Sequence, residues 1–171
     1  MTILYAKSFK PEDGDTAIRV IRLVGTSGTA TTADARVFHY RFYCELDTSE
    51  PRAVSIDMTP GADGRTGVLY IASTGRVNTE SALWIAFEVV PTKPITVSEL
   101  VQFYKMKGFD RFRFNEEGAG CRSYSKKVLA GLESDCYVPS GTEARLVQWS
   151  DEKRKLLPEN IPERWDEGEY Y

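Results

Sequence analysis

Alternating hydrophobic and polar positions mark two neighbouring segments of the chain. The first, RVFHYRFYCEL at 36–46, has an apolar side chain on every second residue, and AVSIDMT at 53–59 repeats the pattern after a short turn. Successive side chains of a β-strand point to opposite faces, so both segments are predicted strands with one buried face. If the two strands form a hairpin with their apolar faces on the same side of the sheet, the numbers of two opposite residues add to an even number (an even index sum). Asp57 then shares the polar face with Tyr43 and, diagonally, with His39.

Further strands are predicted on both sides of this hairpin. β-Branched and aromatic residues mark TILYAKS at 2–8, AIRVIRLV at 17–24 and VLYIAST at 68–74. The nearly continuous apolar run LWIAFEVV at 83–90 predicts a strand that is buried on both faces. The first half of the chain is therefore expected to be rich in strands.

Helices are predicted in the second half. A Thr-x-x-Glu capping box at 96–99 opens an amphipathic stretch that ends at Gly108. Apolar residues at helical spacing predict another helix at 121–133. A Ser-x-x-Glu box at 140–143 predicts a last helix that ends near Leu157.

The order of these elements predicts the fold class. Strands followed by helices indicate an α+β fold, with an antiparallel sheet and helices packed on one face. A length of 171 residues fits one domain with a substantial core. We expect residues 1–157 to form this domain and residues 158–171, PENIPERWDEGEYY, to form an acidic C-terminal tail.

Composition and charge narrow the classes of function. A net charge of −3 gives no global electrostatic reason to expect DNA or RNA binding. No apolar run approaches the roughly 18 residues of a membrane span, and the start of the chain lacks the pattern of a signal peptide. Three cysteines and a single histidine are typical of reduced thiols rather than of a disulfide framework or a zinc site. We therefore expect a cytoplasmic protein with no metal site.

The glycine turn before the predicted helix at 121–133 carries the most specific chemistry. Cys121 follows Gly118 and Gly120 directly, at the start of that helix. The first turn of a helix stabilises a thiolate through unpaired N–H groups and the positive end of the dipole. The same N–H groups could hold a developing oxyanion, and the glycines leave room for a substrate. Cys121 is therefore a candidate nucleophile.

The predicted hairpin supplies a base and a group to orient it. His39 is the only imidazole of the chain, and Asp57 is its best-placed carboxylate. Each of the three residues also has a structural interpretation. Cys121 can pack as a small apolar residue, His39 can form a structural hydrogen bond, and Asp57 can cap the following turn.

Three further side chains are candidates for substrate binding beside this site. Arg122 would contact an acidic group, or else form a surface ion pair. Glu117 would bind a cationic group, or else remain a surface charge. Tyr43 is a candidate because it shares the polar face of the predicted hairpin with His39.

Three motifs together resemble a family of small, uncharacterised fungal proteins. They are FHYRFYCEL, SIDMTPG and GAGCRSYSKKVLAGLE, and the likeness covers residues 36–135. Members of that family have an Ile-Asp-Met-x-Pro strand and a Gly-x-Gly-Cys-Arg helix start. The chain departs from the family pattern at Phe38, where asparagine is frequent, and this departure leaves the substrate preference open.

The order of a histidine on a strand and then a cysteine at a helix start is also similar to permuted papain-like thiol enzymes. The lecithin:retinol acyltransferase group is one example of such enzymes. This resemblance implies a permuted papain-like fold with a catalytic thiol at Cys121, a base at His39 and Asp57 in the third position.

The expected function is thiol-dependent acyl or aminoacyl transfer, or hydrolysis, through a covalent acyl-enzyme on Cys121. It implies a small-molecule or aminoacyl substrate and needs no cofactor. Two alternatives remain open. One is a non-catalytic module that binds a small ligand or peptide on the polar sheet face. The other is a tRNA-dependent cyclodipeptide-forming enzyme, which predicts a basic groove near Lys105 and Arg111, although the overall charge does not indicate tRNA binding.

Overall fold

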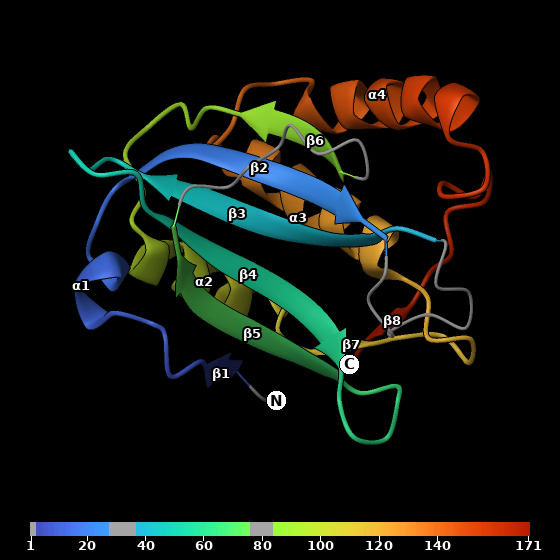
Figure 1. Ribbon diagram of the computed structural model, residues 1–171, viewed down its shortest axis with the longest axis horizontal. Helices are drawn as coiled ribbons and strands as arrows, with labels where there is room; N and C mark the ends of the chain where they lie inside the picture. Colours follow the sequence, from blue (N-terminus) through green and yellow to red (C-terminus); the bar gives the residue numbers. More distant parts are fainter. Residues whose placement is uncertain (1–2, 28–36, 76–83) are drawn as a thin grey trace.

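The computed structural model describes residues 3–27, 37–75 and 84–171, and a six-stranded sheet dominates it (Figure 1). The strands are β1 (Ile3–Tyr5), β2 (Ile18–Thr26), β3 (His39–Leu46), β4 (Ala53–Pro60), β5 (Gly67–Thr74) and β6 (Trp84–Val89). They lie in the order β1-β5-β4-β3-β2-β6. β1 pairs with β5 in parallel, and the other neighbours are antiparallel. The predicted sheet is therefore confirmed as mostly antiparallel.

The helices belong mainly to the second half of the chain. They are α1 (Pro11–Gly14), α2 (Val97–Lys107), α3 (Cys121–Ser134) and α4 (Thr142–Leu156). Figure 1 shows α2 and α3 behind the sheet and α4 beside β6 at the top. The two short strands β7 (Phe112–Arg113) and β8 (Glu169–Tyr170) form a separate pair. The fold is thus α+β, as the order of the predicted elements indicated.

The hairpin of β3 and β4 pairs residues with an even index sum, as predicted. Phe42 pairs with Ile56 and Cys44 with Val54, so the apolar side chains of both strands enter one core. The ladder ends at the Phe42 pair, although β3 starts three residues earlier, at His39. Figure 1 shows the two strands diverging beyond this point, at the end where α3 begins.

β6 differs from its predicted environment. Among the residues that the structure describes, β6 is an edge strand that pairs with β2 alone, and its buried residues alternate with more exposed ones. Phe87 packs against Trp149 of α4 with ring centroids 5.6 Å apart, whereas Glu88 is exposed. The prediction that residues 83–90 are buried on both faces was wrong, because α4 covers only one face of the strand. Residue 83 itself lies outside the described residues.

The predicted cap of α2 is present. The Thr96 hydroxyl accepts from the Glu99 N–H at 3.2 Å, and the Glu99 carboxylate accepts from the Thr96 N–H at 2.8 Å. These two bonds satisfy N–H groups that a helix start leaves unpaired. Gly108 ends the helix in the left-handed region, at φ 71°.

The predicted capping box of α4 does not form. The N-cap is Gly141 rather than Ser140, and it makes no side-chain cap. Instead the carboxylate of Glu133, on α3, accepts from the N–H groups of Gly141 at 2.6 Å and Glu143 at 2.8 Å. The cap therefore comes from the preceding helix.

The segment at 158–171 packs against the rest of the fold. Ile161 is completely buried, and the Asn160 carbonyl accepts from the Phe38 N–H at 2.9 Å. β8 pairs with β7 through Tyr170 and Phe112. The acidic segment is therefore integrated into the structure through its apolar residues.

A helix that crosses a bilayer needs about 20 mostly apolar residues. Within the described residues, none of the helices has both the length and the apolar character that crossing a membrane demands.

Candidate active site

His39 and Asp57 meet where β3 and β4 diverge. Nε2 of His39 lies 2.6 Å from Oδ1 of Asp57. Both residues are buried, since His39 is 1% exposed and Asp57 is 8% exposed. Nε of Arg41 lies 3.4 Å from the other carboxylate oxygen. Since the β3–β4 ladder has ended here, these side chains replace backbone pairing as the link between the two strands.

Cys121 lies at the start of α3, against the first residues of β3. Its sulfur is 4.0 Å from the carbonyl oxygen of Phe38, and the residue is 6% exposed. His39 follows Phe38 and is the first residue of β3, and its imidazole is near enough to the thiol for each group to shift the pKa of the other. The buried Nδ1 of His39 has no partner of standard hydrogen-bond geometry within the described residues.

Electrostatics favour the charged forms of both groups. Burial opposes protonation of His39, but hydrogen bonding to Asp57 and interaction with Cys121 outweigh it and raise the imidazole pKa to about 10. Burial likewise opposes ionisation of Cys121. His39, aided by the Tyr40 backbone N–H, outweighs this and lowers the pKa of the thiol. Each of the two groups therefore favours the charged form of the other.

The glycine turn holds the start of α3 in place. Gly120 is the N-cap, at φ 140°, and a Cβ there would lie 3.0 Å from the Phe112 ring. Both the backbone angle and the space therefore require glycine. Gly118 also lies in the left-handed region, at φ 72°. The Asn115 side chain orders this turn by accepting from the N–H groups of Glu117 and Ala119.

A small cavity borders Cys121. Its volume is about 30 Å³, enough for a water molecule but too small for an acyl group. Its lining includes Tyr40, Gly120 and Arg122, and also Pro162, Arg164 and Asp166 of the C-terminal segment. The C-terminal segment therefore forms one wall of the space beside the thiol.

Comparison with protein families assigns most of the chain to one group. Residues 21–171 match the domain of unknown function DUF7770. The chain belongs to this family. No curated protein and no solved structure matches it. The matched DUF7770 region contains His39, Asp57 and Cys121, so the whole candidate site lies within it.

Arg122 has a different setting from the one expected for a substrate-binding residue. In this DUF7770 domain its guanidinium donates to the Arg164 carbonyl at 2.7 Å and lies 4.2 Å from the centroid of the Trp165 ring. Arg122 thus holds the C-terminal segment against α3. It also lines the cavity beside Cys121.

Two of the predicted substrate-binding residues do not border this cavity. Tyr43 packs against the small cluster of Val24 and Ala53, on the sheet face away from the main core. The Glu117 side chain is exposed, and neither residue lines the space beside Cys121. Gly118 likewise is absent from the lining, whereas Gly120 contributes to it.

Residues outside the predicted catalytic set also contribute to the site in the DUF7770 domain. Arg41 pairs with Asp57, and the alternation of residues 36–46 puts it on the same face as His39 and Tyr43. Nothing in the sequence indicated that residues of the C-terminal segment, such as Asp166, lie beside Cys121. Their position depends on how the chain returns to α3.

Proposed function

We propose that this chain is a cytoplasmic thiol enzyme of permuted papain-like type that transfers or hydrolyses acyl groups through Cys121. The observation that carries the proposal is the arrangement of three residues in one buried site. Cys121 at the start of α3 interacts with His39, whose Nε2 lies 2.6 Å from Asp57. A nucleophile, a base and an orienting acid in this order form the functional unit of thiol acyl transfer.

The first step of the proposed reaction is attack on a carbonyl. The Cys121 thiolate adds to an ester, thioester or amide carbon and forms a C–S bond. The resulting oxyanion accepts hydrogen bonds from the unpaired N–H groups in the first turn of α3. The imidazolium of His39 gives its proton to the leaving group as the bond to that group breaks, which leaves an acyl-enzyme and a neutral imidazole.

The second step returns the enzyme to its starting state. Water or an amine attacks the acyl-enzyme while His39 accepts a proton from the attacking group. The C–S bond then breaks, which releases the acid or amide product and restores the thiolate–imidazolium pair. Asp57 holds the imidazole in position through both steps and stabilises its positive charge.

Access to the thiol is the main requirement of this proposal. The cavity of about 30 Å³ does not admit an acyl group, and residues 162–166 form one of its walls. A substrate therefore enters only when this wall is displaced. The hydrogen bonds of Arg122 to Arg164 and of Ser123 to Asp166 would break in that motion.

The test is the pH dependence of alkylation of Cys121 by iodoacetamide. A Cys136→Ser background removes the exposed thiol, and Cys44 serves as an internal reference, since burial raises its pKa to about 12. A thiol with the ordinary pKa of 9.0 is only about one-thousandth ionised at pH 6. We expect Cys121 to react at nearly the same rate from pH 6 to pH 8, whereas the rate of an ordinary thiol rises about a hundredfold.

A second measurement tests the acyl-enzyme directly. Incubation with p-nitrophenyl acetate should add one acetyl group to the protein, as seen by intact-protein mass spectrometry. His39→Asn and Cys121→Ala should each abolish the addition, while Glu117→Gln, at an exposed position, should leave it unchanged. If Cys121 is alkylated only on unfolding, or shows the pH profile of an ordinary thiol, the enzyme proposal fails and a non-catalytic binding module takes its place.

A further inference from the structure

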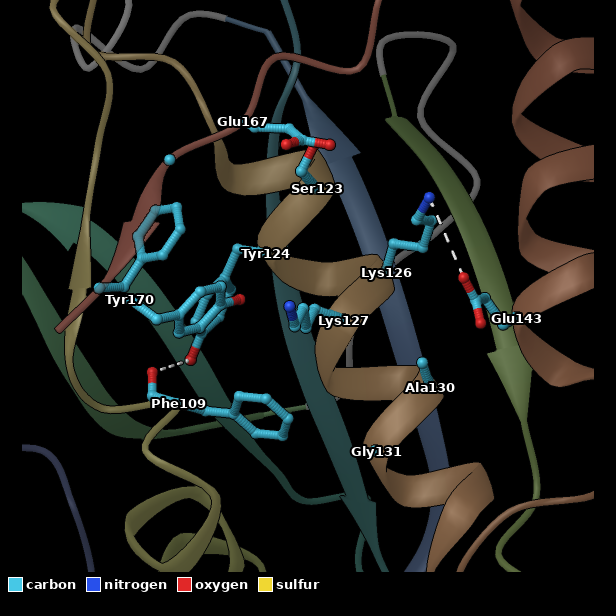
Figure 2. Close-up of a pocket in the computed structure, with 12 residues that line it drawn as sticks. Phe109, Ser123, Tyr124, Lys126, Lys127, Ala130, Gly131, Glu143, Glu167 and Tyr170 are labelled. Carbon is cyan, nitrogen blue, oxygen red and sulfur yellow. Dashed lines mark hydrogen bonds and ion pairs between the residues drawn. The ribbon is translucent and has the colours of Figure 1, made fainter.

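A second, much larger cavity lies beside α3, between that helix, the buried rings of Phe109 and Phe112 and the end of the chain at Tyr170 (Figure 2). Its volume is about 510 Å³, which falls within the range of small-molecule binding sites. Neither Cys121, His39 nor Asp57 lines it. The cavity is therefore distinct from the candidate active site.

Small residues and aromatic rings give this cavity its apolar part. Ala130 and Gly131 lie along α3, and a Cβ on Gly131 would come within 2.8 Å of the Phe109 ring. Figure 2 shows Phe109 and Tyr170 together on one side of the space, facing α3. The ring of Tyr124 stacks beside that of Tyr170, with an angle of 16° between their planes. This end of the cavity fits an apolar or aromatic group.

Charged side chains surround the rest of the cavity, and some of them already have partners. Lys126 lies 4.0 Å from Glu143, across the space between α3 and α4. Lys127 lies over the Tyr170 ring at 5.2 Å but forms no ion pair within the described part of the chain. Glu167 also lines the cavity and has no ion-pair partner among those residues. One cation and one carboxylate are therefore left for a ligand.

We propose that this cavity binds a small zwitterion with an apolar side chain, namely a free amino acid or a short peptide. Its carboxylate would pair with Lys127, its ammonium group with Glu167, and its side chain would lie beside Phe109 and Tyr170. Figure 2 shows Glu167 at one end of the cavity, Lys127 in the middle and Phe109 toward the other end, so both charged partners and the apolar part face one space. Phosphates and other multiply charged anions fit less well, because Glu143 and Glu167 would repel them.

The inference does not depend on the proposed reaction at Cys121. It concerns binding alone, and its failure would leave the thiol chemistry untouched. A Cys121→Ser variant should therefore bind the ligand as well as the original chain does.

The test compares three probes by isothermal titration calorimetry. L-Phenylalanine carries both charges, N-acetyl-L-phenylalanine only the carboxylate, and L-phenylalaninamide only the ammonium group. Loss of one charged contact should weaken binding about tenfold or more, so we expect phenylalanine to bind most tightly. Lys127→Gln should remove the preference for phenylalanine over the amide, and Glu167→Gln should remove its preference over the N-acetyl compound.

Two variants locate the binding within the cavity. Ala130→Leu adds volume to its lining while retaining a strong helix former, and should reduce phenylalanine binding at least tenfold. Lys153→Gln, on α4 outside the lining, should leave binding unchanged. The proposal is overturned if none of the probes binds at millimolar concentration, if the N-acetyl compound binds as tightly as phenylalanine, or if Ala130→Leu has no effect.

Discussion

At the scale of single residues, the chain's only histidine has an unusual ionisation. An ordinary imidazole has a pKa of 6.5, whereas His39 has one of about 10. Burial opposes this shift, and the contacts with Asp57 and Cys121 cause it. Because the folded state holds the proton more tightly than the unfolded state, protonation contributes stability. That contribution is complete below pH 6.5 and is lost as pH rises toward 10.

Asp57→Asn should lower the pKa of His39 and flatten this pH dependence. The amide can still accept a hydrogen bond from the imidazole, but it lacks the charge that stabilises the imidazolium. The single histidine makes the measurement direct, since NMR titration follows one imidazole ring. The free energy of unfolding should fall between pH 7 and pH 10 more steeply in the original chain than in the variant.

The exposed substitution Glu117→Gln is the control, and it should leave the His39 titration unchanged. An imidazole that titrates near pH 6.5 in the unmodified chain would contradict the ion-pair interpretation of the site.

At the scale of elements, the connection between α3 and α4 is stabilised by one carboxylate. The Glu133 carboxylate accepts from the N–H groups of Glu143 and Gly141 at the start of α4. These bonds, the one from Glu143 most, lower the pKa of Glu133 below the usual 4.5. The stability that it contributes is therefore present above pH 4.5 and is lost as pH falls through the lower value.

Glu133→Ala should destabilise the protein at pH 7 by about 1 kcal/mol, which is typical of the loss of a helix cap. Urea unfolding at pH 7 and pH 3 measures the effect, and the difference between the variant and the original chain should shrink at pH 3. Ser140→Ala is the matched control. If Ser140 rather than Glu133 capped α4, the two substitutions would have the opposite order of effects.

At the scale of the whole molecule, the C-terminal segment joins the sheet to α3. Ile161 is fully buried in the main core, and Asn160 bonds to Phe38, the residue before His39. Further along the segment, the Arg164 carbonyl accepts from Arg122, the residue after Cys121. The segment therefore contacts both halves of the candidate site through their sequence neighbours.

Ile161→Ala should lower the free energy of unfolding by about 2–5 kcal/mol, because it leaves a cavity in the core. Chemical unfolding monitored by tryptophan fluorescence would measure the loss. The control is Leu156→Ala at a position that is 73% exposed, where the change should stay within about 0.5 kcal/mol. Equal effects of the two substitutions would show that residues 158–171 behave as a detached tail.

Local patterns in the sequence determined much of this protein. The alternation in β3 and β4 set which side chains share a face, and the observed register keeps Asp57 on the face predicted beside His39. The capping box at Thr96 formed because all of its groups lie within one turn. The glycine turn placed Cys121 at a helix start for the same reason. These predictions depend on neighbours in the chain, which a sequence displays directly.

The tertiary structure alone decided how distant segments meet. The cap of α4 comes from Glu133 on another helix, and β6 became an edge strand because nothing pairs with its far side within the described residues. The wall beside Cys121 comes from the returning C-terminal segment. Each of these contacts joins groups that are far apart in the sequence and meet only when the whole core packs. The pattern of residues along the chain does not indicate that packing.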